Sequence, residues 1–186
     1  MRITSGILRN RRFEVPSEEV RPTMESVREA IFSSLGGKCE ELKVLDLFAG
    51  SGALGMEAWS RGADSVTFVE QHSRVSSILQ NNIQSMESED LGKTRCIKAD
   101  AVTWLARVGE SFDLILADPP YDLPNAFSDT LNGIAEHSVL TADGILVYEL
   151  RSRGSIEIPD SWKVLRDKKY GKTRVLKLKL NSEEES

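Results

Sequence analysis

Apolar and polar positions along this chain follow the alternating strand and helix pattern of an α/β protein. Short apolar runs, typical of buried strands, alternate with segments in which apolar residues recur every three or four positions, typical of amphipathic helices. The pattern predicts strands at residues 44–48, 65–69, 94–98, 112–117 and 144–150, and helices at 53–61, 74–86, 101–108 and 125–137. Because strand and helix alternate, we expect βαβ units and a mostly parallel sheet with helices on both faces.

The first part of the chain departs from this pattern. Residues 3–8 and 12–15 predict the two strands of a short β-hairpin. Apolar residues at helical spacing follow from 24 to 35, with Thr23 as the N-cap of the helix. We therefore expect an N-terminal extension, residues 1–37, before the alternating core.

The last part of the chain also departs from the alternation of strands and helices. Residues 162–166 and 173–180 predict an antiparallel pair that brings the sheet to seven strands. Residues 181–186 predict a flexible tail. We expect residues 38–180 to form the core, and residues 1–180 to form a single domain.

Composition fits one soluble globular domain. The chain has 186 residues, of which 40% are hydrophobic and 28% charged, which is ordinary for such a domain. No apolar run approaches the roughly 18 residues that span a membrane, and no signal-peptide pattern follows Met1, so we expect a cytoplasmic protein. The two cysteines, Cys39 and Cys96, have no nearby Cys or His at metal-binding spacing, and we expect no metal site.

Charge is unevenly distributed along the chain. The net charge is −5, yet residues 1–13 contain four arginines and no acid, and residues 151–180 contain ten Lys or Arg against three acids. Two basic ends around an acidic centre either form a surface that binds phosphates or carry ordinary solvated charge. Composition alone leaves both interpretations open.

The segment Asp118-Pro119-Pro120-Tyr121 directly follows a predicted strand. In open α/β sheets, ligands bind beyond the carboxyl ends of the strands. The prolines withhold two backbone N–H donors, so the segment offers a carboxylate, backbone carbonyls and a flat ring. Such a set can accept hydrogen bonds from an amine and stack on a planar base. We therefore predict transfer of a group to a nucleobase amine, with these four residues as the catalytic ones.

A glycine-rich loop lies between the first predicted strand of the core and its helix. Gly50, Gly52 and Gly55 spell G-x-G-x-x-G, a pattern that lets a ligand approach the backbone and that several nucleotide-binding folds share. Glu70, at the end of the next strand, is placed to accept hydrogen bonds from ribose hydroxyls. A dinucleotide-binding dehydrogenase would use the same parts, so the loop alone does not identify the cofactor.

Four acids that follow successive strands favour one cofactor over the other: Asp46, Glu70, Asp100 and Asp118. Asp46 suits a ligand that carries an ammonium group, whereas it would repel a pyrophosphate. Asp100 is placed to accept from an adenine amine, with a helix N-cap as the alternative. Together the four acids indicate a cationic sulfonium ligand such as S-adenosylmethionine.

With these motifs the chain resembles class I S-adenosylmethionine-dependent amino-methyltransferases. Its N-terminal segment is similar to that of the RsmD-type 16S ribosomal RNA guanine-N2 methyltransferases, and the resemblance runs from residue 2 to about 180. It is carried by the motifs above and by residues 2–6 (RITSG), 9–12 (RNRR), 21–23 (RPT), 27–32 (VREAIF), 48–55 (FAGSGALG) and 170–173 (YGKT). Asn10 stands where we expect glycine from the family pattern.

The resemblance implies a Rossmann-like class I methyltransferase fold and methylation of the exocyclic N2 of one guanine in 16S ribosomal RNA, within a small-subunit assembly particle. We expect a monomer. The implied contacts to S-adenosylmethionine are Asp46, Phe48, Ala49, Gly50, Ser51, Gly52, Glu70, Asp100, Ala101 and Asp118. Arginine is suited to binding phosphates, and the candidates for RNA contact are Arg2, Arg9, Arg11, Arg12, Arg21 and Arg28.

Three alternatives remain open. A DNA adenine-N6 methyltransferase shares Asp-Pro-Pro-Tyr, but such enzymes usually carry a sizeable target-recognition region for which this chain has no room. An NAD-linked oxidoreductase shares the glycine loop, although Asp46 and Asp118 argue against it. A non-catalytic RNA-binding assembly factor would not need an intact Asp118 and cofactor loop.

Overall fold

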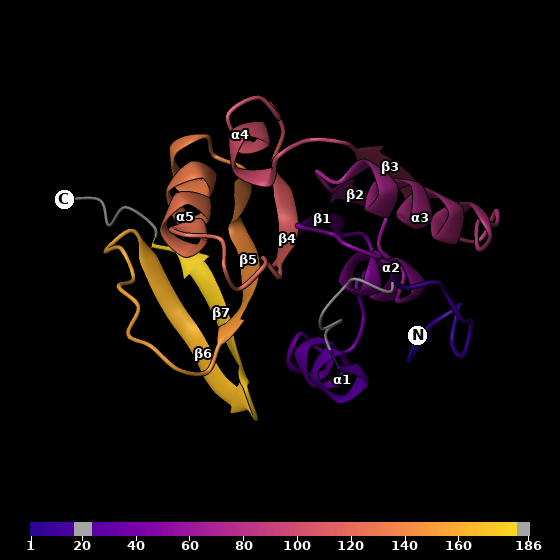
Figure 1. The fold of residues 1–186 in the computed structure, drawn as a ribbon, viewed down its shortest axis with the longest axis horizontal. Helices are drawn as coiled ribbons and strands as arrows, with labels where there is room; N and C mark the ends of the chain where they lie inside the picture. The colour runs from indigo at the N-terminus through magenta and orange to yellow at the C-terminus, as the bar shows by residue number, and fades with distance from the viewer. Residues whose placement is uncertain (17–23, 182–186) are drawn as a thin grey trace.

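The computed structural model describes residues 1–16 and 24–181. Seven strands form one sheet in the order β3-β2-β1-β4-β5-β7-β6, and helices cover both of its faces (Figure 1). The strands are β1 (Lys43–Leu47), β2 (Ser65–Val69), β3 (Lys93–Ile97), β4 (Phe112–Ala117), β5 (Leu140–Arg151), β6 (Trp162–Tyr170) and β7 (Thr173–Leu180). Strands β1 to β5 pair in parallel, whereas β7 pairs antiparallel with both β5 and β6. The predicted mostly parallel sheet is confirmed, with an antiparallel edge.

The strand order reverses in the middle of the sheet. β1 lies between β2 and β4, so the chain returns from β3 at one edge to the centre before it enters β4. At such a reversal the loops after the two central strands lead in opposite directions and leave a crevice between them. The glycine loop follows β1 and Asp118 follows β4, so both lie at the point where this topology predicts a ligand.

The central strands are buried on both faces, which explains their unbroken apolar runs. Alternate residues of a strand point to opposite faces, and accordingly Val44 and Leu114 belong to one hydrophobic core while Leu45 and Ile115 belong to the other. The helices are α1 (Glu25–Ser34), α2 (Ala53–Ser60), α3 (Ser73–Gln84), α4 (Ala101–Leu105) and α5 (Ala126–Glu136). The first core takes its helical residues from α1, α2 and α3, and the second takes them from α4 and α5.

Three elements differ by three or more residues at one end from their predicted ranges. Helix α4 ends at Leu105 rather than at residue 108. Strand β5 begins at Leu140 rather than at residue 144, because Leu140 pairs with Phe112 ahead of an irregularity in the β4–β5 ladder. Strand β6 continues to Tyr170 rather than stopping at 166; its residues from Lys163 to Lys169 are all exposed, so no apolar alternation marks them.

Residues 1–16 contain no regular strands, but residues 1–3 pair antiparallel with residues 11–13. The Ile3 N–H donates to the Arg11 carbonyl at 3.0 Å, and the Phe13 N–H donates to the Met1 carbonyl at 3.0 Å. The predicted hairpin is present, with strands shorter than residues 3–8 and 12–15. A single antiparallel bridge joins Arg2 and Arg12, and turns occupy the residues between them. Helix α2 satisfies further backbone groups of this segment: the Glu57 carboxylate accepts the Thr4 N–H at 3.0 Å, and the Ser60 hydroxyl accepts the Leu8 N–H at 2.9 Å. The extension is therefore fastened to the core by side chains of α2.

Asn10 and Gly6 provide the turns of this segment. Asn10 has a φ of 68°, and asparagine enters this left-handed region more readily than most residues, so it can stand where the family pattern has glycine. A Cβ on Gly6 would lie 1.8 Å from the Ser60 carbonyl oxygen, so only glycine permits this approach to α2. Thr23, predicted as the N-cap of α1, lies outside the described residues.

Among residues 1–16 and 24–181, no helix has the length and apolar character required to cross a membrane. Within the same residues, no group of three or more His, Cys, Asp and Glu side chains is arranged to hold a metal ion.

Candidate active site

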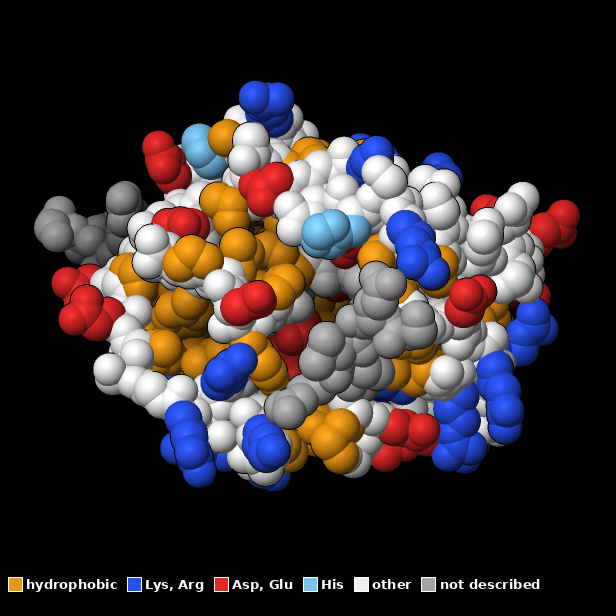
Figure 2. Space-filling view, in the orientation of Figure 1, with side chains coloured by type: hydrophobic (Ala, Val, Ile, Leu, Met, Phe, Trp, Pro, Cys, Tyr) orange, Lys and Arg blue, Asp and Glu red, His pale blue; other side chains and the backbone are white. Residues whose placement is uncertain are grey.

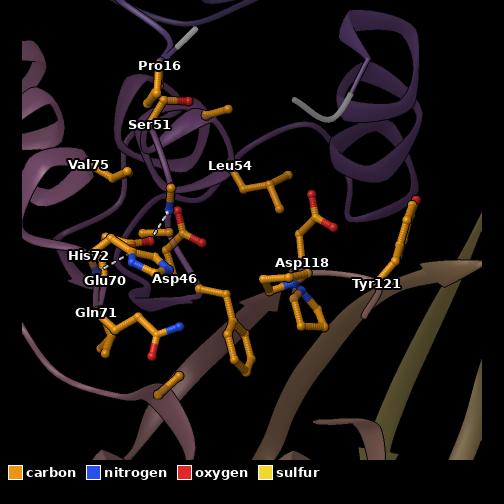
Figure 3. Close-up of a pocket in the computed structure, with 18 of the residues that line it drawn as sticks. Pro16, Asp46, Ser51, Leu54, Glu70, Gln71, His72, Val75, Asp118 and Tyr121 are labelled. Carbon is orange, nitrogen blue, oxygen red and sulfur yellow. Dashed lines mark hydrogen bonds between the residues drawn. The ribbon is translucent and has the colours of Figure 1, made fainter. Parts of the chain in front are cut away.

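A pocket of about 1180 Å³ opens beyond the carboxyl ends of β1, β2, β4 and β5. Its wall includes the glycine loop, the segment that follows β2, and the residues from Asp118 to Asp122. Figure 3 shows that Asp118 lies between Asp46 and Tyr121, with its carboxylate toward the open space. In the space-filling view the same region is a hollow lined by apolar and acidic side chains (Figure 2).

The glycine loop forms one end of the pocket and is built from left-handed backbone. Phe48, Gly50 and Gly52 have φ values of 60°, 54° and 87°, and Phe48 holds this conformation although it has a bulky side chain. Such outliers cost about 1–3 kcal/mol and persist only where the surroundings enforce them, often at ligand sites. The Ala49 N–H donates to the Val69 carbonyl at 2.9 Å, which fixes the loop to the end of β2.

Gly52 and Gly55 lie where the backbone packs closely against neighbouring side chains. A Cβ on Gly52 would lie 2.4 Å from Leu79 of α3, and a Cβ on Gly55 would lie 2.3 Å from Phe68 of β2. Gly52, which is predicted to contact the cofactor, is not among the residues that line the pocket. Its place in the fold is behind the loop, at the start of α2.

Asp46 and Glu70 line the pocket and also brace the glycine loop. Asp46 is buried, and its Oδ2 accepts the Gly55 N–H at 2.8 Å. Glu70 Oε2 accepts the Gly50 N–H at 2.9 Å and Oε1 accepts the His72 N–H at 2.7 Å (Figure 3). Because a carboxylate has about four acceptor sites, Glu70 retains capacity for ribose hydroxyls. Thus two of the four acids predicted to contact the cofactor, Asp46 and Glu70, lie at one end of the pocket.

Asp100 occupies the position of a helix cap. Its Oδ1 accepts the Thr103 N–H at 2.8 Å at the start of α4, and its side chain is not part of the pocket wall, whereas the neighbouring Ala99 and Ala101 are. The structure therefore shows the N-cap that the sequence left as an alternative. A contact between Asp100 and an adenine stays a prediction.

The Asp-Pro-Pro-Tyr segment forms the middle of the pocket. β4 ends at Ala117; Asp118 is partly exposed, Pro119 is buried and Pro120 is exposed. The Tyr121 hydroxyl lies 3.3 Å from Thr173 Oγ1, and the Arg151 guanidinium carbon lies 5.1 Å from the centre of the Tyr121 ring. The ring is thus held from two sides by residues of β5 and β7.

Residues that the sequence motifs missed complete the far wall. Arg151, Ser152, Arg153, Gly171 and Lys172 line the pocket at the end of β5 and in the turn between β6 and β7. The signals for them in the sequence are the excess of Lys and Arg among residues 151–180 and, for Gly171 and Lys172, the segment 170–173 that takes part in the family resemblance. That excess does not say which of the ten basic residues face the site, because pairing of β5 with β7 decides this.

Buried Asn82 of α3 joins the N-terminal extension to the glycine loop. Its Oδ1 accepts the Glu14 N–H at 2.9 Å, and its Nδ2 donates to the Glu14 carbonyl at 2.9 Å and to the Ser51 carbonyl at 3.2 Å. Two residues after Glu14, Pro16 reaches the pocket wall (Figure 3). The extension and the cofactor end of the pocket are therefore mechanically connected.

The six arginines predicted to contact RNA fall into different environments. Arg9 and Arg12 are exposed. Arg2 is also exposed but pairs with Glu25 at 2.7 Å, and Arg11 donates to the Ser85 carbonyl at 2.9 Å. Arg21 lies outside the described residues.

Arg28 is fully buried, which argues against the predicted contact with RNA. Its side chain has no exposed surface and lies 3.8 Å from the Glu57 carboxylate, while its Nη2 donates to the Arg2 carbonyl at 2.8 Å. Burial lowers the pKa of Arg28, and the charge of Glu57 partly opposes this shift. A helical pattern cannot reveal such burial, because Met1 and Arg2, which contact the Arg28 guanidinium, belong to the segment that precedes α1.

Neither cysteine has the features of a nucleophile. Burial raises the pKa of Cys39 and that of Cys96 to about 11. A thiol is a good nucleophile only as its thiolate, so both remain protonated and weakly reactive at neutral pH.

Comparisons with known proteins show which family the chain is similar to. The family described as conserved hypothetical protein 95 matches residues 1–179. Ribosomal RNA small subunit methyltransferase D of Escherichia coli is 32% identical over 173 residues, which are 92% of this chain and 85% of that protein. The protein of the same name in Haemophilus influenzae is 30% identical over 174 residues, covering 92% of this chain and 89% of its own.

Solved structures show the same fold. The structure of yhhF of Escherichia coli, provisionally named a methyltransferase, matches with a TM-score of 0.86 at 30% identity over 97% of each chain. TrmN of Thermus thermophilus shares the fold alone, with a TM-score of 0.67 at 20% identity over 83% of this chain and 48% of that one. The Rossmann-like class I methyltransferase fold is confirmed. The chain belongs to the RsmD family of ribosomal RNA small subunit methyltransferases.

Proposed function

We propose that this protein transfers the methyl group of S-adenosylmethionine to the exocyclic N2 amine of one guanine in 16S ribosomal RNA. The observation that carries the proposal is the position of Asp118, at the end of a central strand, between the acidic cofactor end of the pocket and the Tyr121 ring (Figure 3). The relatives named as small-subunit ribosomal RNA methyltransferases support the same activity.

The glycine loop fits S-adenosylmethionine better than a dinucleotide. In dinucleotide-binding folds, N–H groups of the loop and of the helix start bind the pyrophosphate. In this loop the Gly50 N–H donates to Glu70 and the Gly55 N–H donates to Asp46. Two carboxylates thus occupy the positions from which a pyrophosphate would draw its hydrogen bonds, and they would repel its charge. This arrangement argues against the NAD-linked alternative.

Different residues of the pocket would bind different parts of the cofactor. Asp46, Gly50 and Ser51 would hold the methionine part, with the Asp46 carboxylate near its ammonium group, and Glu70 would accept from the ribose hydroxyls. Ala101 and Phe48 line the pocket; Ala101 would lie beside the adenine, and Phe48 would pack beneath the cofactor. When bound, S-adenosylmethionine supplies an electrophilic methyl group on a sulfonium.

Asp118 and the Pro119 carbonyl would hold the acceptor amine. The N2 lone pair of guanine is delocalised into its ring, so the amine is a poor nucleophile. Hydrogen bonds from its two N–H groups to these oxygens fix its orientation and favour pyramidal nitrogen. Alignment of two reactants in this way can lower the barrier by about 7–11 kcal/mol.

Tyr121 would stack on the target base. A base that leaves its own stack costs a few kcal/mol, and stacking on an aromatic side chain returns about 1–3 kcal/mol. The contacts from Thr173 and Arg151 hold the ring in place before RNA arrives, so little side-chain freedom is lost when the base binds.

The RNA substrate would reach the pocket along the N-terminal extension, residues 1–37, which connects to the catalytic core of residues 38–180. Exposed Arg9 and Arg12 are its best-placed cations. We further propose a monomer that acts in the cytoplasm on a small-subunit particle. If Arg9, Arg11 and Arg12 bind phosphates, changing all three to Gln should flatten the salt dependence of RNA binding.

Asp118→Ala tests the catalytic role. The variant should bind S-adenosylhomocysteine in a calorimetric titration but should transfer at least about 100-fold less labelled methyl to 16S ribosomal RNA, since a carboxylate that only positions a reactant can account for a loss of this order. Asp122→Ala removes the exposed acid of the same pocket and is the matched control. Undiminished transfer by Asp118→Ala would refute the role, and methylation of DNA adenine instead of RNA would favour the DNA-directed alternative.

A further inference from the structure

Three cations form a rim at the acceptor end of the pocket: Arg151, Arg153 and Lys172, here called the cationic rim. Arg151 is the last residue of β5, Arg153 follows it, and Lys172 lies in the turn between β6 and β7. All three line the pocket and are exposed. Figure 2 shows Lys and Arg side chains gathered along the lower edge of the hollow.

The cationic rim is not neutralised within the protein. Within the described part of the chain, none of its members takes part in an ion pair, whereas Arg2, Arg95 and Arg174 each pair with a carboxylate. Asp118 and Asp122 share this end of the pocket, and Asp118 is assigned to the acceptor amine. Three exposed cations without a carboxylate partner at one edge of a pocket are available to an anionic ligand.

The rim shares a rigid frame with the Tyr121 ring. The Ser152 N–H donates to the Lys172 carbonyl at 2.8 Å, which joins the end of β5 to the β6–β7 turn. Arg151 and Thr173 are cross-strand partners in the β5–β7 ladder, and both contact Tyr121. A base stacked on Tyr121 therefore brings its sugar and phosphate to the same frame that carries the cations.

The cofactor does not explain these cations. S-adenosylmethionine carries a positive sulfonium, an ammonium group and a single carboxylate but no phosphate, and the end of the pocket assigned to it is lined by Asp46 and Glu70. Those acids lie on the other side of Asp118 from Tyr121 (Figure 3). The charge of the rim therefore matches the acceptor rather than the methyl donor.

We propose that the cationic rim binds phosphates of the RNA backbone beside the target guanosine. This inference rests on the proposed function and adds a second RNA surface to the N-terminal extension, so that RNA is held on both sides of the pocket. Arg151 has a further part, because its guanidinium covers one face of Tyr121 and leaves the base a single face on which to stack.

The test is the double variant Arg153→Gln/Lys172→Gln, which leaves the Tyr121 contact intact. Binding to transcribed 16S ribosomal RNA is measured at several salt concentrations, together with KM for RNA. Each lost phosphate contact should lower the slope of log affinity against log salt by about 0.7–0.9, so the double variant should lose about 1.4–1.8. KM should rise, while affinity for S-adenosylhomocysteine should stay at the wild-type value.

Lys163→Gln/Lys179→Gln is the matched control. These two residues pair across the opposite end of the β6–β7 hairpin, and their replacement removes the same charge away from the pocket. The exchange Arg153→Lys/Lys172→Arg keeps the charge and should keep the slope. If the rim and control variants lower the slope equally, or neither lowers it, the rim proposal is overturned. If wild-type protein methylates no RNA, the proposed function itself fails, and the two failures are thereby distinguished.

Discussion

Removal of the Glu57 carboxylate tests whether the N-terminal extension is part of the folded core. Glu57 lies on α2 and has no exposed side-chain surface. It accepts hydrogen bonds from the backbone N–H groups of Thr4 and Ser5 and pairs with Arg28 and with Arg61. One carboxylate thus joins the backbone of Thr4 and Ser5, α1 and α2. We predict that Glu57→Ala is strongly destabilising.

The magnitude follows from the groups that the substitution leaves behind. Arg28 is fully buried and would lose the carboxylate that lies 3.8 Å from its Nε. Removing one partner of a buried ion pair costs about 3–5 kcal/mol, and N–H groups of Thr4 and Ser5 would lose their acceptor as well. We expect the free energy of unfolding to fall by at least about 3 kcal/mol, which corresponds to a midpoint roughly 6–12 °C lower in a protein of this size.

Denaturant unfolding followed by circular dichroism measures this loss. Glu110→Ala is the control, because it also removes a carboxylate that pairs with an arginine, Arg95, but those side chains are 38% and 50% exposed. An exposed pair is worth under about 1 kcal/mol. If Glu57→Ala costs no more than Glu110→Ala, the extension and Arg28 do not depend on this carboxylate, and the reasoning is refuted.

Two further predictions concern the loop and the thiols. Gly55→Ala would place a Cβ 2.8 Å from Asp46 Oδ2, so it should lower the free energy of unfolding by about 1–3 kcal/mol and weaken S-adenosylhomocysteine binding in a titration. Gly133→Ala is the control and should leave that binding unchanged. Equal affinities of the two variants for S-adenosylhomocysteine would contradict this prediction. Because burial raises the pKa of Cys39 and of Cys96 to about 11, thiol-reagent labelling at pH 8 should be on the order of 100-fold slower in the folded than in the unfolded protein. Labelling should accelerate as pH rises toward 11, and equal rates in both states at pH 8 would contradict the burial argument.

The sequence predicts the centre of the site well because the signals there are local. An apolar run ends directly before Asp118, and the glycine loop directly follows β1, so both lie at the carboxyl ends of parallel strands wherever those strands pair. The sequence also predicts that the strands run mostly parallel, since alternating strands and helices favour a parallel sheet. These features depend on neighbours along the chain and not on distant contacts.

The features that the sequence misses depend on distant contacts. Arg28 occupies a helix whose pattern alone does not show that the N-terminal extension covers its guanidinium. Arg151 and Lys172 meet only because β5 pairs with β7. The predicted hairpin has shorter strands than expected because side chains of α2, which no local pattern reveals, accept the N–H groups of Thr4, Ser5 and Leu8. In each case a partner more than twenty residues away decides the outcome.

The central claim is that this protein methylates N2 of one guanine in 16S ribosomal RNA. Mass-spectrometric mapping of 16S ribosomal RNA from cells with and without the gene tests it most directly. The account predicts that deletion removes a single N2-methylguanosine, that the wild-type gene restores it, and that the Asp118→Ala gene does not. A deletion strain that keeps every N2-methylguanosine of its 16S ribosomal RNA would contradict the account.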